Sequence, residues 1–350
     1  MSDLLGLAFL LIAIYYIIKI SLNHNQSIII LALFCSFLAG VRISFLPFLI
    51  PGIIYLMYIV SKKSKMYFIL FFFLGLFSWI IPMILITGYN DFFEIAYNHI
   101  NGHFFKWGGS VLTNNSPYWF RCIKIFESLW ADGLGGWWYH RHWITLVISF
   151  GILFFFTKSI YHFKIKKNND TLIIVLISMA IYFLWIFFFQ NIIYKPRHVI
   201  PLIPFILMFI SFGITRLNKK LFYVNWIKYL FFTFYIILTM VLVMQHKQPS
   251  SLVQLKSFLI NYNTERKVLY SSNLINNFVK HHNGTEKIKF LSNNNFKMIK
   301  NYYSLNYSIF STQKITDDLK MNLINVKSFY HNPYVNRLWP QLKLYEYKKE

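Results

Sequence analysis

Several cationic residues stand beside long apolar segments, where ionisable groups are costly to bury. Arg42 separates two apolar runs, and Lys195, Arg197 and His198 lie between two others. A guanidinium matches the geometry of a phosphate and donates paired hydrogen bonds to it. These residues therefore suit a lipid-linked phosphate at the membrane surface. The alternative is that Arg42 snorkels at a helix end and that the second cluster is a solvated turn.

A third set of cations lies in the aromatic-rich segment 88–142. His103 and Lys106 are flanked by glycines and aromatic residues, and Arg121 follows. Aromatic faces suit sugar rings, and imidazole and ammonium groups suit phosphate oxygens. The pattern favours a site for a phosphorylated sugar, although a single loop histidine is more often simply solvated.

Carboxylates that could act as a base are scarce, because the chain has 12 Asp plus Glu against 35 Lys plus Arg. Those expected near the outer membrane face are Asp3, Asp91, Glu94, Glu127 and Asp132. Asp91 and Glu94 are three residues apart and can share a helix face. We take these two as the candidate catalytic residues.

The sequence gives little support for a metal site or a nucleotide site. His140 and His142 are two residues apart and His281 and His282 are adjacent, without further ligands at a recognised spacing. The sequence has no phosphate-binding loop of the Walker type. We therefore expect no metal and no cofactor. The charge of +23 lacks a basic-aromatic nucleic-acid motif, so anionic lipid is the expected partner and nucleic acid is not.

The elements that must position these residues are membrane helices. Of 350 residues, 56% are hydrophobic and 13% charged, whereas a soluble domain has roughly 25% charged residues. We predict an α-helical polytopic membrane domain over 1–245, with about eight spans, and a soluble α/β domain over 246–350. The expected spans are Leu4–Ile20, Ile28–Val41, Ile43–Val60, Tyr67–Ile86, Trp143–Phe156, Thr171–Ile192, Val199–Ile214 and Tyr223–Met244. The second and third are short and could instead be broken helices that line a cavity.

Loop charge predicts the orientation. Lysine and arginine gather after the third, fifth and seventh runs, which makes that side cytoplasmic. The loop 88–142, the turn near Lys195 and the C-terminal domain then lie outside. Within this loop, Asp91–Asn98 and Trp119–Trp130 are expected to form interfacial helices; the alternative is an aromatic belt that only anchors the protein.

The C-terminal domain alternates short strands with helices. The expected strands are Lys267–Ser271, Lys287–Leu291, Tyr307–Ser311 and a closing strand Gln341–Tyr347. The helices between them are Ser272–Lys280 and Asn295–Tyr302. This alternation indicates a small α/β layer.

Three segments carry a resemblance to a known family. Gly40–Pro47 reads Gly-x-Arg-x-Ser-x-x-Pro, and Lys195–Pro204 contains Arg-x-x-x-Pro-x-x-Pro. The third is Gly102–Gly109 together with Ala131–Gly135. With them the chain resembles GT-C-type polytopic glycosyltransferases, in the bacterial relatives of the protein mannosyltransferases and aminoarabinose transferases.

The resemblance implies transfer of a sugar from a polyprenyl-phosphate donor to a glycan, lipid or protein acceptor outside the bacterial inner (plasma) membrane. A carboxylate serves as base and cations stabilise the phosphate leaving group. The residues that it implies for the donor phosphate are Arg42, His103, Lys106, Arg121, Lys195 and Arg197.

The chain departs from the family at its start. The family has an additional first span and a first outer loop with an essential aspartate, and neither precedes Leu4. We therefore expect a shortened member, inactive alone or completed by another polypeptide. The alternative function is a transporter or flippase of a lipid-linked glycan, which should show paired broken spans in two halves.

Overall fold

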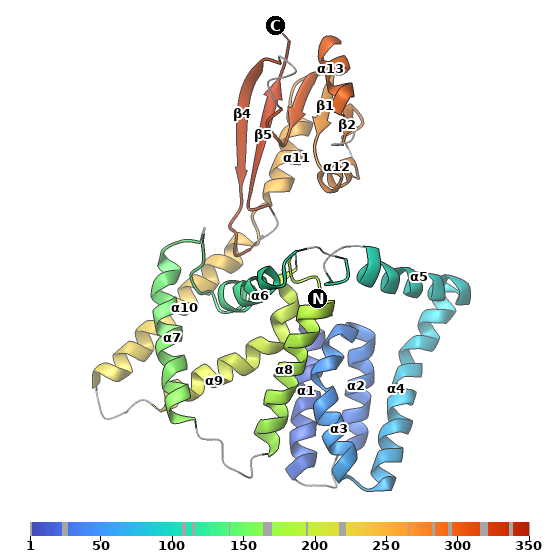
Figure 1. The fold of residues 1–350 in the computed structure, drawn as a ribbon, viewed down its shortest axis with the longest axis vertical. Coiled ribbons are helices and arrows are strands. Elements are labelled where there is room, and N and C mark those ends of the chain that lie inside the picture. The colour runs from blue at the N-terminus through green and yellow to red at the C-terminus, as the bar shows by residue number, and fades with distance from the viewer. Residues whose placement is uncertain are drawn as a thin grey trace. The chain divides into compact units, whose positions relative to one another are not determined.

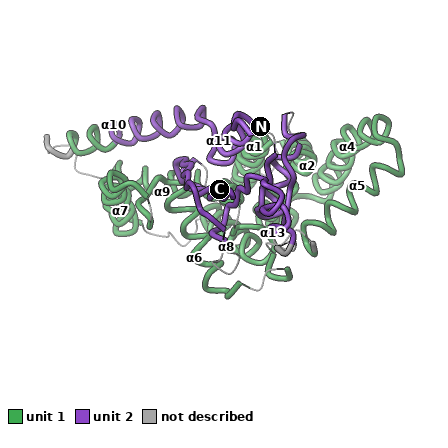
Figure 2. Tube along the Cα trace, turned by 90° about the horizontal axis from the view of Figure 1, so that it is seen from above, with its two compact units in different colours: residues 1–231 green, residues 232–350 purple. Residues whose placement is uncertain are grey.

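The computed structural model describes most of the chain. The described ranges are 2–22, 27–106, 110–113, 116–139, 141–163, 170–193, 195–216, 222–264, 266–281, 284–292, 296–315, 321–335 and 339–349, with the backbone only at 106, 222–224 and 296–297. Two compact units divide the chain at residues 231 and 232, inside one helix (Figure 2). The boundary predicted after residue 245 lies at the end of that helix.

Unit 1 is helical (Figure 1). Its elements are α1 (Ser2–Leu22), α2 (Ile28–Arg42), η1 (Ile43–Phe48), α3 (Ile50–Ile59), α4 (Lys62–Thr87), α5 (Tyr89–Asn101), η2 (Gly102–Lys106), α6 (Tyr118–Glu127), η3 (Ser128–Gly133), α7 (Ile144–His162), α8 (Asp170–Phe189), η4 (Pro196–Leu202), α9 (Ile203–Thr215) and α10 (Phe222–Gln245), which continues into unit 2.

Seven helices of the described chain are long and apolar enough to cross a membrane. They are Ser2–Leu22, Ile28–Phe48, Lys62–Thr87, Ile144–His162, Asp170–Phe189, Pro196–Thr215 and Asn225–Gln245. Their exposed surfaces are rich in large apolar side chains, especially along α4. The prediction of a multi-pass membrane protein is thereby supported.

The third predicted apolar run, Ile43–Val60, contains a helix that is too short to cross the membrane by itself. The helix α3 has ten residues, about 15 Å of rise, which is shorter than the hydrocarbon core. Pro47 lies inside η1, and a proline also stands in the first turn of α3. Because proline lacks an N–H donor, it favours a break followed by a new helix start. Arg42 lies at this break with a non-helical backbone (φ −154°, ψ 73°).

The core of unit 1 joins the first helices to α8 and η4. Leu10, Leu38, Phe45 and Phe48 are all at most 1% exposed in this cluster, and Tyr182 of α8 packs against both phenylalanine rings. The core therefore holds α1, α2, η1 and α8 together near Arg42.

The backbones of α7 and α9 lie very close together where the two helices cross at Gly213. A Cβ atom there would lie 2.0 Å from the Phe155 backbone oxygen and 2.9 Å from Ser159 Oγ. The Ser159 hydroxyl also donates to the Phe209 carbonyl. Small residues at such crossings let helix backbones approach closely in membranes.

Gly213→Ala is therefore expected to lower the free energy of unfolding by about 1–3 kcal/mol, since the helices must separate to admit the methyl group. Thermal unfolding in detergent measures this effect. Ser211→Ala, at an exposed position of the same helix, should leave the midpoint unchanged. Equal midpoints for the two variants would contradict the close crossing.

Two helices of the predicted outer segment run across the end of unit 1 where α1 begins (Figure 1). The helix α5 has no buried residue, and α6 buries Arg121, Ile125 and Glu127 while exposing Tyr118 and Trp119. Helices were predicted at both places, and the structure confirms them.

Unit 2 contains a five-stranded sheet in the order β2-β1-β3-β5-β4. The elements are α11 (Ser251–Asn261), β1 (Lys267–Tyr270), α12 (Asn273–Lys280), β2 (Ile288–Leu291), α13 (Phe296–Ser304), β3 (Ser308–Ser311), β4 (Leu323–Tyr330) and β5 (Gln341–Tyr347). The first three strands are parallel, and β5 pairs antiparallel with β3 and β4. One hydrophobic cluster includes α11 and α12, and another includes α13.

The predicted strands and helices of the tail are confirmed, but β4 was missed. Seven of its eight positions, Leu323 to Ser328 and Tyr330, are exposed, and Phe329 alone is buried. An edge strand with little burial lacks the alternating pattern by which strands are found in a sequence.

Candidate functional site

An aspartate and two arginines from separate parts of unit 1 meet at one end of its helices. Arg42 Nη2 forms an ion pair with Asp3 Oδ1, and Arg197 Nη1 lies 3.7 Å from Asp3 Oδ2. Asp3 belongs to the first turn of α1, where a carboxylate is stabilised by the helix dipole. The three side chains form the acid–arginine cluster.

Close packing places Arg42 at this position. A Cβ atom on Gly6 would lie 2.7 Å from Arg42 Cβ, so the arginine stem passes directly over that glycine of α1. The guanidinium carbon lies 5.7 Å from the centre of the Phe45 ring. The side chains of Arg42 and Asp3 are about one-fifth exposed, at 19% and 21%, whereas Arg197 is 48% exposed. A ligand can therefore reach the cluster from the Arg197 side.

Two further basic residues, Lys195 and His198, flank Arg197 in the chain, close to the acid–arginine cluster. Burial lowers the pKa of Lys195, and the charges of Arg197 and Arg42 lower it further. His198 is 5% exposed, and its two ring nitrogens have no hydrogen-bond partner in the described chain. Its backbone oxygen accepts a hydrogen bond from Tyr182 Oη at 3.0 Å. Buried polar groups are normally paired, so the free imidazole marks a place for a polar ligand.

His103 belongs to the same electrostatic environment. Burial lowers its pKa from 6.5, the positive charges of His99 and Lys195 act in the same direction, and a backbone hydrogen bond at Phe189 opposes them. His103 is therefore uncharged at neutral pH. An anion bound nearby would favour its protonated form.

The lowered pKa of His103 predicts a pH dependence of stability. Below pH 6.5 the unfolded chain takes up a proton that the folded chain does not, so the free energy of unfolding decreases as the pH is lowered. His103→Gln should remove part of this slope in thermal unfolding measured at a series of pH values. His246→Gln, at an exposed position, is the control. Identical slopes for the wild type and His103→Gln would refute this assignment.

Arg121 has a different environment from the acid–arginine cluster. Its side chain is fully buried, Nε donates to the Phe187 carbonyl and Nη2 to the Gln190 carbonyl, both at 2.9 Å. Burial lowers its pKa. These acceptors end α8, where helix carbonyls lack partners within the helix. The guanidinium thus holds α6 against the end of α8.

The other predicted site residues are placed as follows. Asp91 and Glu94 are exposed on α5 and form no ion pair within the described chain. The backbone of Lys106 ends η2, and its side chain lies outside the described residues. The structure therefore brings Arg42 and Arg197 together at Asp3, and Lys195 lies near enough to both arginines to feel their charge.

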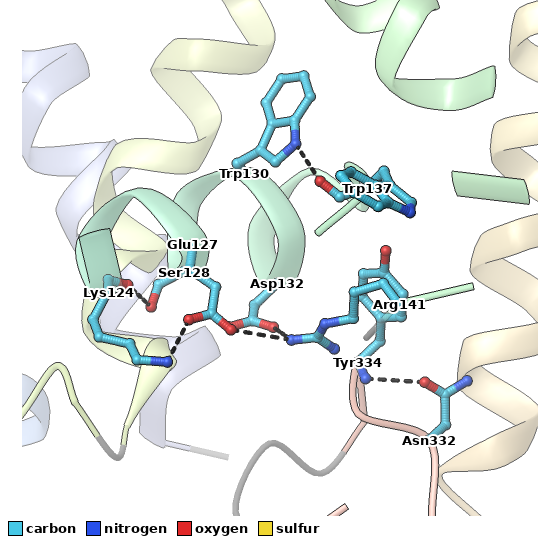
Figure 3. A network of polar contacts seen from close by, with 9 residues as sticks. All are labelled: Lys124, Glu127, Ser128, Trp130, Asp132, Trp137, Arg141, Asn332 and Tyr334. Carbon is cyan, nitrogen blue, oxygen red and sulfur yellow. Dashed lines mark hydrogen bonds and ion pairs between the residues drawn. The ribbon is translucent and has the colours of Figure 1, made fainter. Parts of the chain in front are cut away.

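A second polar network stabilises the segment after α6 (Figure 3). Arg141 Nη2 lies 2.7 Å from Asp132 Oδ1 and 3.8 Å from Glu127 Oε1, and Lys124 Nζ lies 2.7 Å from Glu127 Oε2. Trp130 Nε1 donates to the Trp137 carbonyl at 2.9 Å. The network fixes η3 and the chain that follows it.

Residues from the three sequence segments named above are linked within unit 1 in two places. A Cβ atom on Gly133 would lie 2.3 Å from Ile203 Cδ1, which joins η3 to the start of α9. Arg197 and Arg42 share Asp3. Residues distant in sequence thus converge at one end of the helices.

Asp3 is among the acids expected near the outer face, but the sequence predicted Asp91 and Glu94 as the catalytic candidates. One signal was available: between Ser2 and Asn90 it is the only acidic residue. The predicted topology also placed it on the same side as Arg42 and Arg197. The helical spacing of Asp91 and Glu94 was the weaker guide, because it shows a shared face without a cationic partner.

Comparison of the chain with protein-family models, curated proteins and solved structures finds no match.

Proposed function

We propose that the chain is a membrane glycosyltransferase that uses a polyprenyl-phosphate-linked sugar as donor. The observation that carries the proposal is the acid–arginine cluster, in which Asp3 contacts Arg42 and Arg197. A carboxylate and two guanidiniums are the groups that a base and a phosphate site require. The unpaired imidazole of His198 adds a further donor or acceptor for the ligand.

In the proposed mechanism, Asp3 and the donor phosphate compete for the two arginines. Without donor, Arg42 and Arg197 pair with Asp3. A donor phosphate takes up guanidinium hydrogen bonds and leaves the carboxylate less constrained. An acceptor hydroxyl or amine then attacks the anomeric carbon and transfers its proton to Asp3, while the bond from that carbon to the phosphate oxygen breaks. The polyprenyl phosphate is the leaving group, and the two arginines stabilise its negative charge. The sugar is transferred with inversion at the anomeric carbon.

The location of the reaction follows from loop charge. The lysine-rich segments at the start of α4 and after α7 are assigned to the cytoplasmic side. In this proposal the site and unit 2 lie on the outer face of a bacterial inner membrane, and α5 and α6 lie in the headgroup layer. Unit 2 then faces the compartment that contains the acceptor.

Transfer of radiolabelled sugar in proteoliposomes tests the function. The wild type should convert a polyprenyl-phosphate sugar into a labelled acceptor, while Arg42→Gln and Arg197→Gln should lose most of this activity. Lys62→Gln, at an exposed lysine in the first turn of α4, should retain it. Uptake of the donor into the vesicles without a covalent product would instead support a transporter.

A further inference from the structure

A large apolar cavity lies between α7, α8 and α9. It encloses about 1000 Å³. Its walls come from the last turns of α7, the first half of α8 and most of α9, and they include Phe156, Leu176, Met179, Phe205 and Phe209. The helices α8 and α9 diverge in this direction (Figure 1). The cavity therefore lies in the half of the helices opposite to the acid–arginine cluster.

The size and lining of this cavity require an apolar occupant. Protein interiors are close-packed, with few voids larger than a water molecule. A cavity lined by aromatic and aliphatic side chains does not retain water, since water there lacks hydrogen-bond partners. Between membrane helices, hydrocarbon chains are the material that fills such a space. An acyl chain of the surrounding bilayer would therefore fit this lining.

Two basic side chains line one end of the cavity. His162 ends α7 and Arg216 follows α9, and both line the cavity. The Arg216 guanidinium carbon lies 4.7 Å from the centre of the Phe212 ring, and Arg216 has no ion pair within the described chain.

The neighbouring sequence supplies no counter-charge. Residues 163–169 and 217–221 contain five lysines and no acidic residue. The nearby carboxylate of Asp170 accepts a hydrogen bond from Tyr55 Oη at 3.2 Å. Asp170 forms no ion pair with Arg216 within the described chain, so Arg216 is available to an anion from the bilayer.

We propose that the cavity binds a phospholipid with an anionic headgroup, taken from the leaflet next to the lysine-rich loops. Its acyl chain fills the cavity and its phosphate contacts Arg216 and His162. Basic pockets between membrane helices on the cytoplasmic side favour such headgroups. Arg216 and Arg197 lie at opposite ends of Pro196–Thr215, about 30 Å apart along the helix. The site is therefore separate from the proposed donor site and does not depend on sugar transfer.

Lipid retention tests this site. The full chain is reconstituted into nanodiscs of phosphatidylcholine with a minor fraction of phosphatidylglycerol, re-extracted into detergent, and its bound lipids are quantified. The wild type should be enriched in phosphatidylglycerol, and Arg216→Gln should reduce the enrichment about fivefold. Leu176→Trp, which occupies the cavity without changing charge, should reduce retention of both lipids. Lys158→Gln, whose lysine lies over the Phe154 ring and does not line the cavity, should match the wild type.

Three results would overturn the proposal. The first is equal enrichment of phosphatidylglycerol in the wild type and Arg216→Gln. The second is unchanged lipid retention in Leu176→Trp, which would place the lipid elsewhere on the surface. The third is displacement of the bound phosphatidylglycerol by polyprenyl phosphate, which would assign the cavity to the donor. Circular dichroism and size-exclusion chromatography confirm that each variant is folded.

Discussion

Asp3→Asn is expected to reduce the rate of sugar transfer by about 10²–10⁴-fold, the contribution of a positioned general base. The amide keeps the size of the side chain but accepts a proton poorly and cannot form an ion pair with Arg42 or Arg197. Single-turnover transfer at saturating donor measures the chemical step separately from donor binding.

The matched controls are the two carboxylates on α5. Asp91→Asn and Glu94→Gln remove exposed acids that form no ion pair within the described chain, so both should retain the wild-type rate. Thermal unfolding shows whether Asp3→Asn is folded. If Asp3→Asn keeps full activity and Asp91→Asn or Glu94→Gln loses it, the base lies on α5 and the acid–arginine cluster has only a structural role.

Arg141→Met is expected to lower the free energy of unfolding by about 3–5 kcal/mol. The side chain of Arg141 is 3% exposed, and those of Asp132 and Glu127 are 10% and 8% exposed. Removal of the guanidinium leaves Asp132 without this partner in a site of low polarity, where a charge is costly. Thermal or denaturant unfolding in detergent measures the loss.

Lys124→Met is the comparison for this prediction. Lys124 pairs with Glu127 at 2.7 Å, but its side chain is 24% exposed and the two residues are one helical turn apart. Pairs of this kind contribute about 0.2–1 kcal/mol. If Lys124→Met lowers the free energy of unfolding as much as Arg141→Met does, burial does not determine how much each ion pair contributes to stability.

Asp3 and Arg141 lie at the same end of unit 1 but are expected to have different roles. Asp3 and the arginines are expected to act on the ligand, whereas Arg141 stabilises η3, which packs on the start of α9 through Gly133 and Ile203. Because Arg197 lies just before α9 in the chain, a disordered η3 would also disturb the acid–arginine cluster. Arg141→Met should thus lose activity in proportion to the folded fraction.

The sequence by itself determined the class of the protein and most of its elements. Long apolar runs predicted the membrane helices, and the alternation of short strands with helices predicted the layer in unit 2. These features depend on composition and period over neighbouring residues. For this reason α5, α6 and the strands β1, β2, β3 and β5 were found, whereas the exposed edge strand β4 was not.

The tertiary structure decided which ionisable residues meet. Arg42 and Arg121 looked alike in the sequence, yet one contacts Asp3 and the other the carbonyls of Phe187 and Gln190. Their partners are far away along the chain, and the packing of α1, α2, α6 and α8 brings them together. A local pattern shows which side of the membrane a residue faces, but a pairing between distant residues depends on how the helices pack.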